Sequence, residues 1–204
     1  MGISPARPFT TTRIKLSAAG SSDDTTARKD LAYSWDFNND GESDATGPEV
    51  TKRFRNAGYR KIALTVTNEA GNATSVGRTV LVRRLIRCHA DRVTKTGSWT
   101  NVRNRRANGG SYCRNDSDPT TRDVLEMRFK GPRLVVIHGD SARGGRAAVL
   151  IDGRRMKTMS FRGDQRRIAF GQKLALSGLG KGPHTVKIVM QRGRGYVEGF
   201  SMRS

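Results

Sequence analysis

The sequence predicts an all-β protein made of two β-sandwiches in tandem, and three observations support this prediction. The chain has 204 residues, more than a usual single β-domain, so two domains are expected. Glycine occurs 23 times, and most apolar residues lie in short runs that alternate with polar ones. The period of about 3.6 residues that marks an amphipathic helix is almost absent.

The expected domains are residues 1–83 and 93–204, joined by a basic connector at 84–92. No apolar run reaches the length of about 18 residues that a membrane span needs. Residues 1–10 also lack the charged and apolar regions of a secretory signal. We therefore expect no membrane insertion.

The first half has the pattern of short antiparallel strands separated by turns. In the clearest strand, Leu31, Tyr33, Trp35 and Phe37 alternate with small or polar residues, which is typical of a strand with one buried face. Turn residues such as Asn and Gly separate the other expected strands, which lie at 14–16, 50–54, 62–66 and 78–82. Together these strands predict a β-sandwich.

Spaced motifs in this half resemble the PKD (polycystic kidney disease) domain, an immunoglobulin-like β-sandwich. The matching residues, within about 10–83, are Ser21-Ser22-Asp23, Tyr33-x-Trp35-Asp36-Phe37-x-x-Asp40-Gly41 and Gly58-Tyr59-x-x-Ile62-x-Leu64-x-Val66-x-Asn68-x-x-Gly71. The turn after the Trp-Asp-Phe strand is longer than the common Gly-Asp-Gly form, and the first strand is shortened. The resemblance implies an extracellular module that acts as a spacer, an adhesion unit or a helper of degradative enzymes.

The turn after the Trp35 strand is rich in oxygen ligands, which come from Asp36, Asn38, Asp40 and Asp44. Calcium takes six to eight such oxygens, so one interpretation is a calcium site, the only cofactor that we expect. Gly47 stands where an EF-hand loop has its closing bidentate acid. In the other interpretation, the carboxylates accept hydrogen bonds from backbone amides of the turn.

The second half repeats the pattern of short strands. Leu134-Val135-Val136-Ile137 is a continuous apolar run of the kind found in a central strand. Asp152-Gly153 predicts a two-residue hairpin turn. The expected strands lie near residues 99–102, 111–113, 125–129, 134–137, 147–151, 154–161, 168–176, 184–190 and 196–202.

These strands and turns resemble a jelly roll of the galactose-binding and carbohydrate-binding type. The resemblance covers about residues 93–203 and rests on Trp99, Gly110-Ser111-Tyr112, Phe129-x-Gly131, Gly145-x-Ala147-x-Val149-x-Ile151-Asp152-Gly153, Leu179-x-x-Gly182-x-His184-x-Val186-x-Ile188 and Val197-Glu198-Gly199-Phe200. These are core and turn positions, so they indicate the fold more than a ligand. No exposed aromatic cluster for sugar stacking is evident, and no binding residue is carried over.

The positive charge lies mostly in the second half. Residues 1–83 hold 12 Lys/Arg and 9 Asp/Glu, whereas residues 84–204 hold 26 and 9, so the second half should attract polyanions. Arginine forks bind phosphate, sulfate and carboxylate in a bidentate manner. The candidate binding residues are therefore basic, although each cluster can also be a solvated face: Arg103, Arg105, Arg106, Arg143, Arg146, Arg154, Arg155, Lys157, Arg166 and Arg167.

The two cysteines, Cys88 and Cys113, lie near the start of the second domain, and we expect a disulfide between them, which favours an oxidising compartment. The alternative is a pair of buried thiols in a reducing compartment.

His138-Gly139-Asp140-Ser141 is similar to the Gly-Asp-Ser element of one esterase family. His89 and His184 lie outside that stretch and match no triad pattern, so we expect no enzyme activity.

Three functions remain open. The first is a non-catalytic secreted or cell-surface module that binds carbohydrate or an anionic envelope polymer, with the PKD-like half as a spacer. The second is a structural decoration or assembly protein of a virion, such as a phage capsid or tail, or of a cell surface, with protein partners. The third is a nonspecific nucleic-acid binder, which has charge in its favour but lacks a recognition motif and interleaved aromatic residues.

Overall fold

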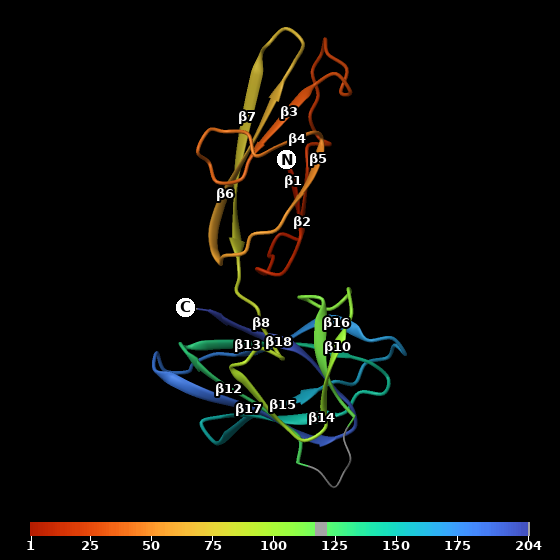
Figure 1. The fold of residues 1–204 in the computed structure, drawn as a ribbon, viewed down its shortest axis with the longest axis vertical. Helices are drawn as coiled ribbons and strands as arrows, with labels where there is room; N and C mark the ends of the chain where they lie inside the picture. Colours follow the sequence, from red (N-terminus) through yellow and green to blue (C-terminus); the bar gives the residue numbers. More distant parts are fainter. Residues whose placement is uncertain (117–121, 204) are drawn as a thin grey trace. The chain divides into compact units, whose positions relative to one another are not determined.

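The computed structural model describes residues 1–116 and 122–203 (Figure 1). The described residues form strands, turns and loops without a helix, which confirms the predicted all-β class. They also contain no helix that is long and apolar enough to span a membrane. The chain divides into two compact units, Met1–Arg84 and Leu85–Ser204.

The first unit is a sandwich of two antiparallel sheets. One sheet has three strands in the order β1-β2-β5, and the other has four in the order β4-β3-β6-β7. The strands are β1 (Gly2–Ser4), β2 (Ile14–Ser17), β3 (Ala32–Asp36), β4 (Ala45–Thr46), β5 (Glu49–Lys52), β6 (Gly58–Thr67) and β7 (Ala73–Val82).

Trp35 of β3 lies at the centre of the core of this unit. Its side chain is fully buried among residues that include Leu16 of β2 and Leu64 of β6. Its indole Nε1 donates a hydrogen bond of 2.8 Å to the Gly47 carbonyl. Because the Gly47 carbonyl accepts this hydrogen bond, the buried indole N–H is not left without a partner.

The second unit contains a 6-stranded and a 5-stranded sheet. The first has the order β10-β11-β18-β13-β16, with β8 also paired to β18, and the second has the order β15-β14-β17-β12-β9. The strands are β8 (Ile86–Arg87), β9 (Val93–Thr96), β10 (Trp99–Arg103), β11 (Ser111–Asn115), β12 (Val124–Lys130), β13 (Arg133–Asp140), β14 (Arg146–Ile151), β15 (Arg154–Ser160), β16 (Ala169–Leu176), β17 (Pro183–Arg192) and β18 (Gly195–Arg203). Buried residues of both sheets, such as Val136, Phe200 and Ile188, form one core.

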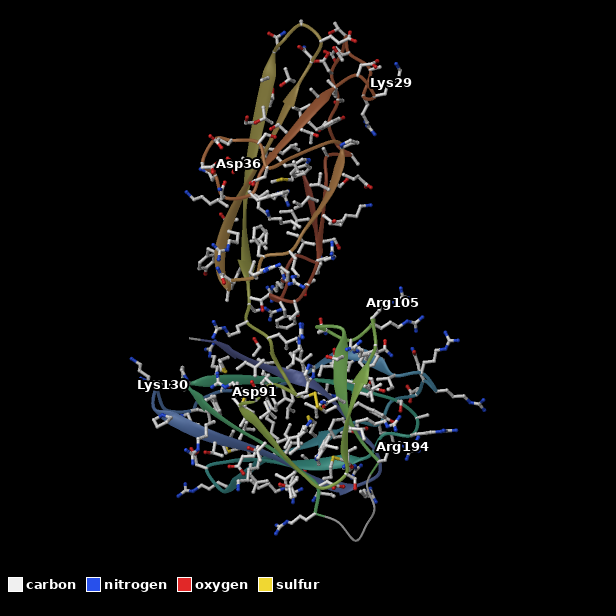
Figure 2. The ribbon with its side chains drawn as sticks, viewed as in Figure 1. Lys29, Asp36, Asp91, Arg105, Lys130 and Arg194 are labelled. Carbon is white, nitrogen blue, oxygen red and sulfur yellow. A yellow bond between two sulfur atoms is a disulfide. The ribbon has the colours of Figure 1, made fainter. Side chains whose placement is uncertain are left out.

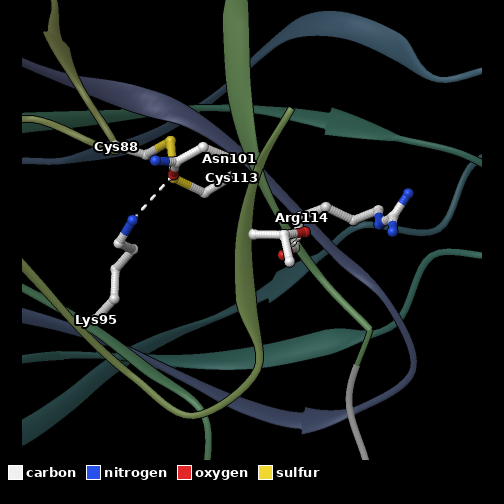
Figure 3. The surroundings of a disulfide bond; sticks show 6 residues. Cys88, Lys95, Asn101, Cys113 and Arg114 are labelled. Atoms are coloured by element: carbon white, nitrogen blue, oxygen red, sulfur yellow. Dashed lines mark hydrogen bonds between the residues drawn. A yellow bond between two sulfur atoms is a disulfide. The ribbon is translucent and has the colours of Figure 1, made fainter. Parts of the chain in front are cut away.

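The stretch 84–92, which we expected to be a connector, is partly built into the second unit. Ile86 pairs with Phe200 of β18, and the Cys88 N–H donates to the Glu198 carbonyl at 3.1 Å. Cys88 and Cys113 form a disulfide that joins this stretch to β11, and Lys95 and Asn101 are hydrogen-bonded nearby (Figure 3). Leu85, Ile86 and Cys88 of this stretch are buried. They lie close together among basic residues, so the sequence shows no strand pattern there.

Candidate functional site

An open hollow of about 460 Å³ on the second unit is the candidate site. It brings together basic residues that are far apart in the sequence, because one of its walls is the loop after β10 and the other is the segment that leads into β16. We call it the arginine hollow, and its lining residues are Asn104, Arg106, Arg166, Arg167, Ile168 and Phe170.

A buried carboxylate links the two segments that line the arginine hollow. Glu198 of β18 is fully buried and accepts hydrogen bonds from the backbone N–H and the side-chain amide of Asn108, in the loop after β10. Its second oxygen accepts the N–H of Gly171 in β16 at 2.7 Å. Glu198 therefore fixes both walls of the hollow to the same central strand.

Glu198 is held in an environment that is unfavourable for its charge. Desolvation by burial raises the pKa of Glu198, although the N–H groups of Gly171 and Asn108 oppose that shift. Both oxygens of the Glu198 carboxylate accept hydrogen bonds from these residues. Its role is to position the loops rather than to contact a ligand.

The charge that faces the arginine hollow is positive. Arg106, Arg166 and Arg167 are exposed, and none of them forms an ion pair with another residue that the structure describes. Ile168 and Phe170 are half-buried and add an apolar wall, and the Phe170 ring packs 5.1 Å from that of Tyr112. This combination suits an anionic ligand that also has an apolar face.

The other predicted basic residues do not line the arginine hollow. Arg154, Arg155 and Lys157 lie on β15, which is an edge strand, where Arg155 bonds to Thr158 and Lys157 to the Ala175 carbonyl. Charges of this kind keep a sheet edge from pairing with another chain. Arg103, Arg105, Arg143 and Arg146 are exposed at other positions, and Figure 2 shows Arg105 extending away from the sheets.

The acidic turn of the first unit bonds mainly to its own backbone. Asp36 accepts hydrogen bonds from the N–H groups of Asn38, Asn39 and Gly41. Desolvation raises the pKa of Asp36, but these N–H groups outweigh it and hold the pKa below its ordinary value.

The remaining acids of the turn have similar partners. Asp40 accepts the Glu42 N–H and the Asn38 side-chain amide, and Asp44 accepts the Phe37 N–H at 2.6 Å. A carboxylate oxygen that accepts one N–H keeps a second lone pair that an ion could use, so calcium at this turn stays a prediction.

Two further sequence features have structural explanations. The Ser141 hydroxyl is buried and donates to the Tyr196 hydroxyl at 3.1 Å rather than facing a histidine. Within the described residues, the one group of three potential metal ligands among His, Cys, Asp and Glu is Cys88, His89 and Cys113. Its two sulfur atoms are joined in the disulfide.

Sequence reasoning missed Glu198, Asn108 and Phe170. A signal for Glu198 is present in Val197-Glu198-Gly199-Phe200, because a single acid within an apolar strand needs donors around it. Nothing comparable marks Asn108 or Phe170, since their importance depends on the contact between two distant loops.

Replacing Glu198 by glutamine is expected to loosen the arginine hollow. Glutamine has one acceptor oxygen, so its NH₂ group must face either the Asn108 donors or the Gly171 N–H. We expect a loss of about 1–3 kcal/mol in the unfolding free energy of the second unit, measured in urea. The control is E126Q, because Glu126 forms a partly exposed ion pair with Lys187 and should change stability by about 0.5 kcal/mol or less. Equal effects of the two substitutions would contradict the role of Glu198.

Comparison with known proteins matches the first unit to one family. Residues 4–82 match the model of the PKD domain. No curated protein matches the chain in sequence.

Several solved structures are similar to this chain at low identity. One, reported for the promiscuous specificity of carbohydrate-binding modules of the β-sandwich superfamily, is 15% identical, with a TM-score of 0.46 over 99% of this chain and 96% of that one. A family 35 carbohydrate-binding module from Clostridium thermocellum is 13% identical, with a TM-score of 0.45 over 59% of this chain and 98% of that one. A family two carbohydrate esterase from Cellvibrio japonicus is 14% identical, with a TM-score of 0.42 over 58% of this chain and 32% of that one. Likenesses this distant do not indicate a ligand.

Proposed function

We propose that this chain is a non-catalytic binding protein whose second unit binds an acidic polysaccharide at the arginine hollow. The observation that carries this proposal is the meeting of Arg106, Arg166 and Arg167, which come from two distant stretches and have no acidic partner among the described residues. Guanidinium groups pair with carboxylates or sulfates, while Ile168 and Phe170 provide a surface for a sugar ring.

The dimensions of the arginine hollow favour a short polymer segment over a nucleic-acid strand. Its volume of about 460 Å³ is within the range of small-ligand sites. Proteins that bind single-stranded nucleic acid use a groove with several aromatic platforms for successive bases. Among the described residues that line this hollow, Phe170 is the one aromatic residue.

The first unit is proposed to act as a spacer at a cell surface or in a secreted protein. Its match to the PKD domain supports a modular role. The disulfide of the second unit supports an oxidising compartment, because such bonds persist mainly in extracellular proteins.

The test compares two triple variants that remove equal charge. R106A/R166A/R167A alters the arginine hollow, and R154A/R155A/K157A alters edge strand β15. We expect the first variant to bind polygalacturonate at least about tenfold more weakly and the second to change little, since charge-assisted hydrogen bonds are lost only in the first. Calorimetry with polygalacturonate, a teichoic-type polymer, DNA and neutral dextran, each over a salt series, gives the affinities. Equal losses in the two variants, or binding of every polyanion that disappears uniformly by moderate salt, would leave only nonspecific electrostatics.

A further inference from the structure

The first unit carries a hollow of its own, with a volume of about 570 Å³. Five cationic residues and one open aromatic ring line it, together with polar residues of the turn after β3. We call it the basic hollow, and its five cationic residues and its open ring are Lys52, Arg53, Arg55, Arg60, Lys61 and Tyr59.

We propose that the basic hollow is a second site for acidic polysaccharide, so that the first unit binds ligand in addition to acting as a spacer. The site consists of first-unit residues alone and does not depend on the arginine hollow. Its ligand would be a short run of sugar units that carry carboxylate or sulfate groups.

The cations of the basic hollow come from both sheets of the first unit. Lys52 ends β5 of the three-stranded sheet, and Arg53 and Arg55 follow it. Arg60 and Lys61 belong to β6 of the four-stranded sheet. The cations of the basic hollow therefore come from two sheets, whereas an ordinary solvated strand face would supply them from one strand.

These cations are not neutralised by nearby acids. In residues 1–116 and 122–203, none of the five forms an ion pair. Asp44 is the one acidic residue in the lining, and one of its oxygens accepts the Phe37 N–H. Because these like charges line the same hollow, they repel one another, and an anion that enters is attracted by several of them at once.

Part of the basic hollow is already ordered for binding. The Arg60 guanidinium donates to the carbonyl of Asn56 at 3.2 Å and to that of Ala57 at 3.5 Å. The Lys52 ammonium lies 4.4 Å from the centre of the Phe37 ring. Side chains that are fixed before a ligand arrives lose less conformational freedom on binding.

The aromatic surface favours a sugar over a row of bases. Tyr59 is 73% exposed, and its cross-strand partner Leu81 is 42% exposed. Lys52 already covers the Phe37 ring, and Phe54 is half-buried. One open ring with an aliphatic neighbour suits the apolar face of a single sugar, whereas nucleic-acid strands need successive stacking platforms.

The test uses the full chain that carries R106A/R166A/R167A, so that binding at the arginine hollow is removed first. In this background we add R53A/R55A/K61A or, as a control with the same loss of charge from exposed first-unit residues outside the basic hollow, R13A/K29A/R78A. The probes are polygalacturonate, chondroitin sulfate, poly-dT and neutral dextran. Urea unfolding verifies that each variant remains folded.

We expect R53A/R55A/K61A to weaken the remaining polygalacturonate or chondroitin sulfate binding by about tenfold or more, and the control to change it by less than about twofold. Y59S changes no charge and should weaken binding several-fold. The proposal is overturned by equal losses in the two triple variants, by absence of acidic-polysaccharide binding in the background chain, or by tighter binding of poly-dT that depends on Tyr59. If the background chain instead binds as the unaltered chain does, the proposed function of the arginine hollow fails, and the comparison of the two added triple variants still supports or overturns the basic hollow.

Discussion

Replacing Trp35 by alanine is expected to destabilise the first unit by about 3–5 kcal/mol, the usual cost of removing a large aromatic residue from a core. Trp35 is fully buried in a core that contains residues of its own sheet and of the facing sheet. Alanine would leave a cavity, and the Gly47 carbonyl would lose its 2.8 Å hydrogen bond. Small domains are stable by only about 5–15 kcal/mol, so a large fraction of the stability of this unit should disappear.

Urea unfolding, followed by fluorescence and circular dichroism, measures this effect. We expect the transition of the first unit to move to lower urea and that of the second unit to stay in place. Y59A is the control, because Tyr59 is 73% exposed and its removal should cost about 0.5 kcal/mol or less. A Trp35→Ala chain that unfolds at the same urea concentration as the Y59A chain would show that the core does not depend on this side chain.

The fold class was predictable because buried strand faces leave a period of two in the sequence. Leu31, Tyr33, Trp35 and Phe37 alternate in the sequence and are all buried in the structure. The first part of β7 was missed because residues 73–79 are exposed and carry no apolar alternation. Their position comes from backbone pairing with β6, which the sequence pattern does not record.

The binding sites were harder to predict than the fold. Basic positions can be identified individually, but the contact between the Arg106 loop and the Arg166 segment depends on Glu198 and on the course of the strands between them. The basic hollow was missed for a different reason. The total of 12 basic and 9 acidic residues over 1–83 is nearly balanced, so it hides the local concentration of cations at 52–61. The dense run of cations and aromatics at 52–61 was a usable signal.

Reducing the Cys88–Cys113 disulfide is expected to destabilise the second unit by about 3 kcal/mol, because the bond limits the freedom of the unfolded chain. The cysteines are 25 residues apart, and both are fully buried. The bond joins the stretch after β8 to β11, and both of these strands pair with β18. Without it, the short β8 should detach first, since among the described residues its pairing with β18 is limited to Ile86, Arg87 and the neighbouring Cys88 N–H.

The measurement compares urea unfolding of the full chain with and without dithiothreitol, alongside a C88S/C113S variant and a thiol assay under denaturing conditions. The first unit is an internal control, because it contains no cysteine and its transition should not respond to the reductant. Agreement between the reduced chain and the variant would separate loss of the bond from side effects of the reagent. If two thiols become titratable but the transition of the second unit does not move, the bond contributes little to the stability of this sandwich, and packing around β18 holds the β8 segment in place.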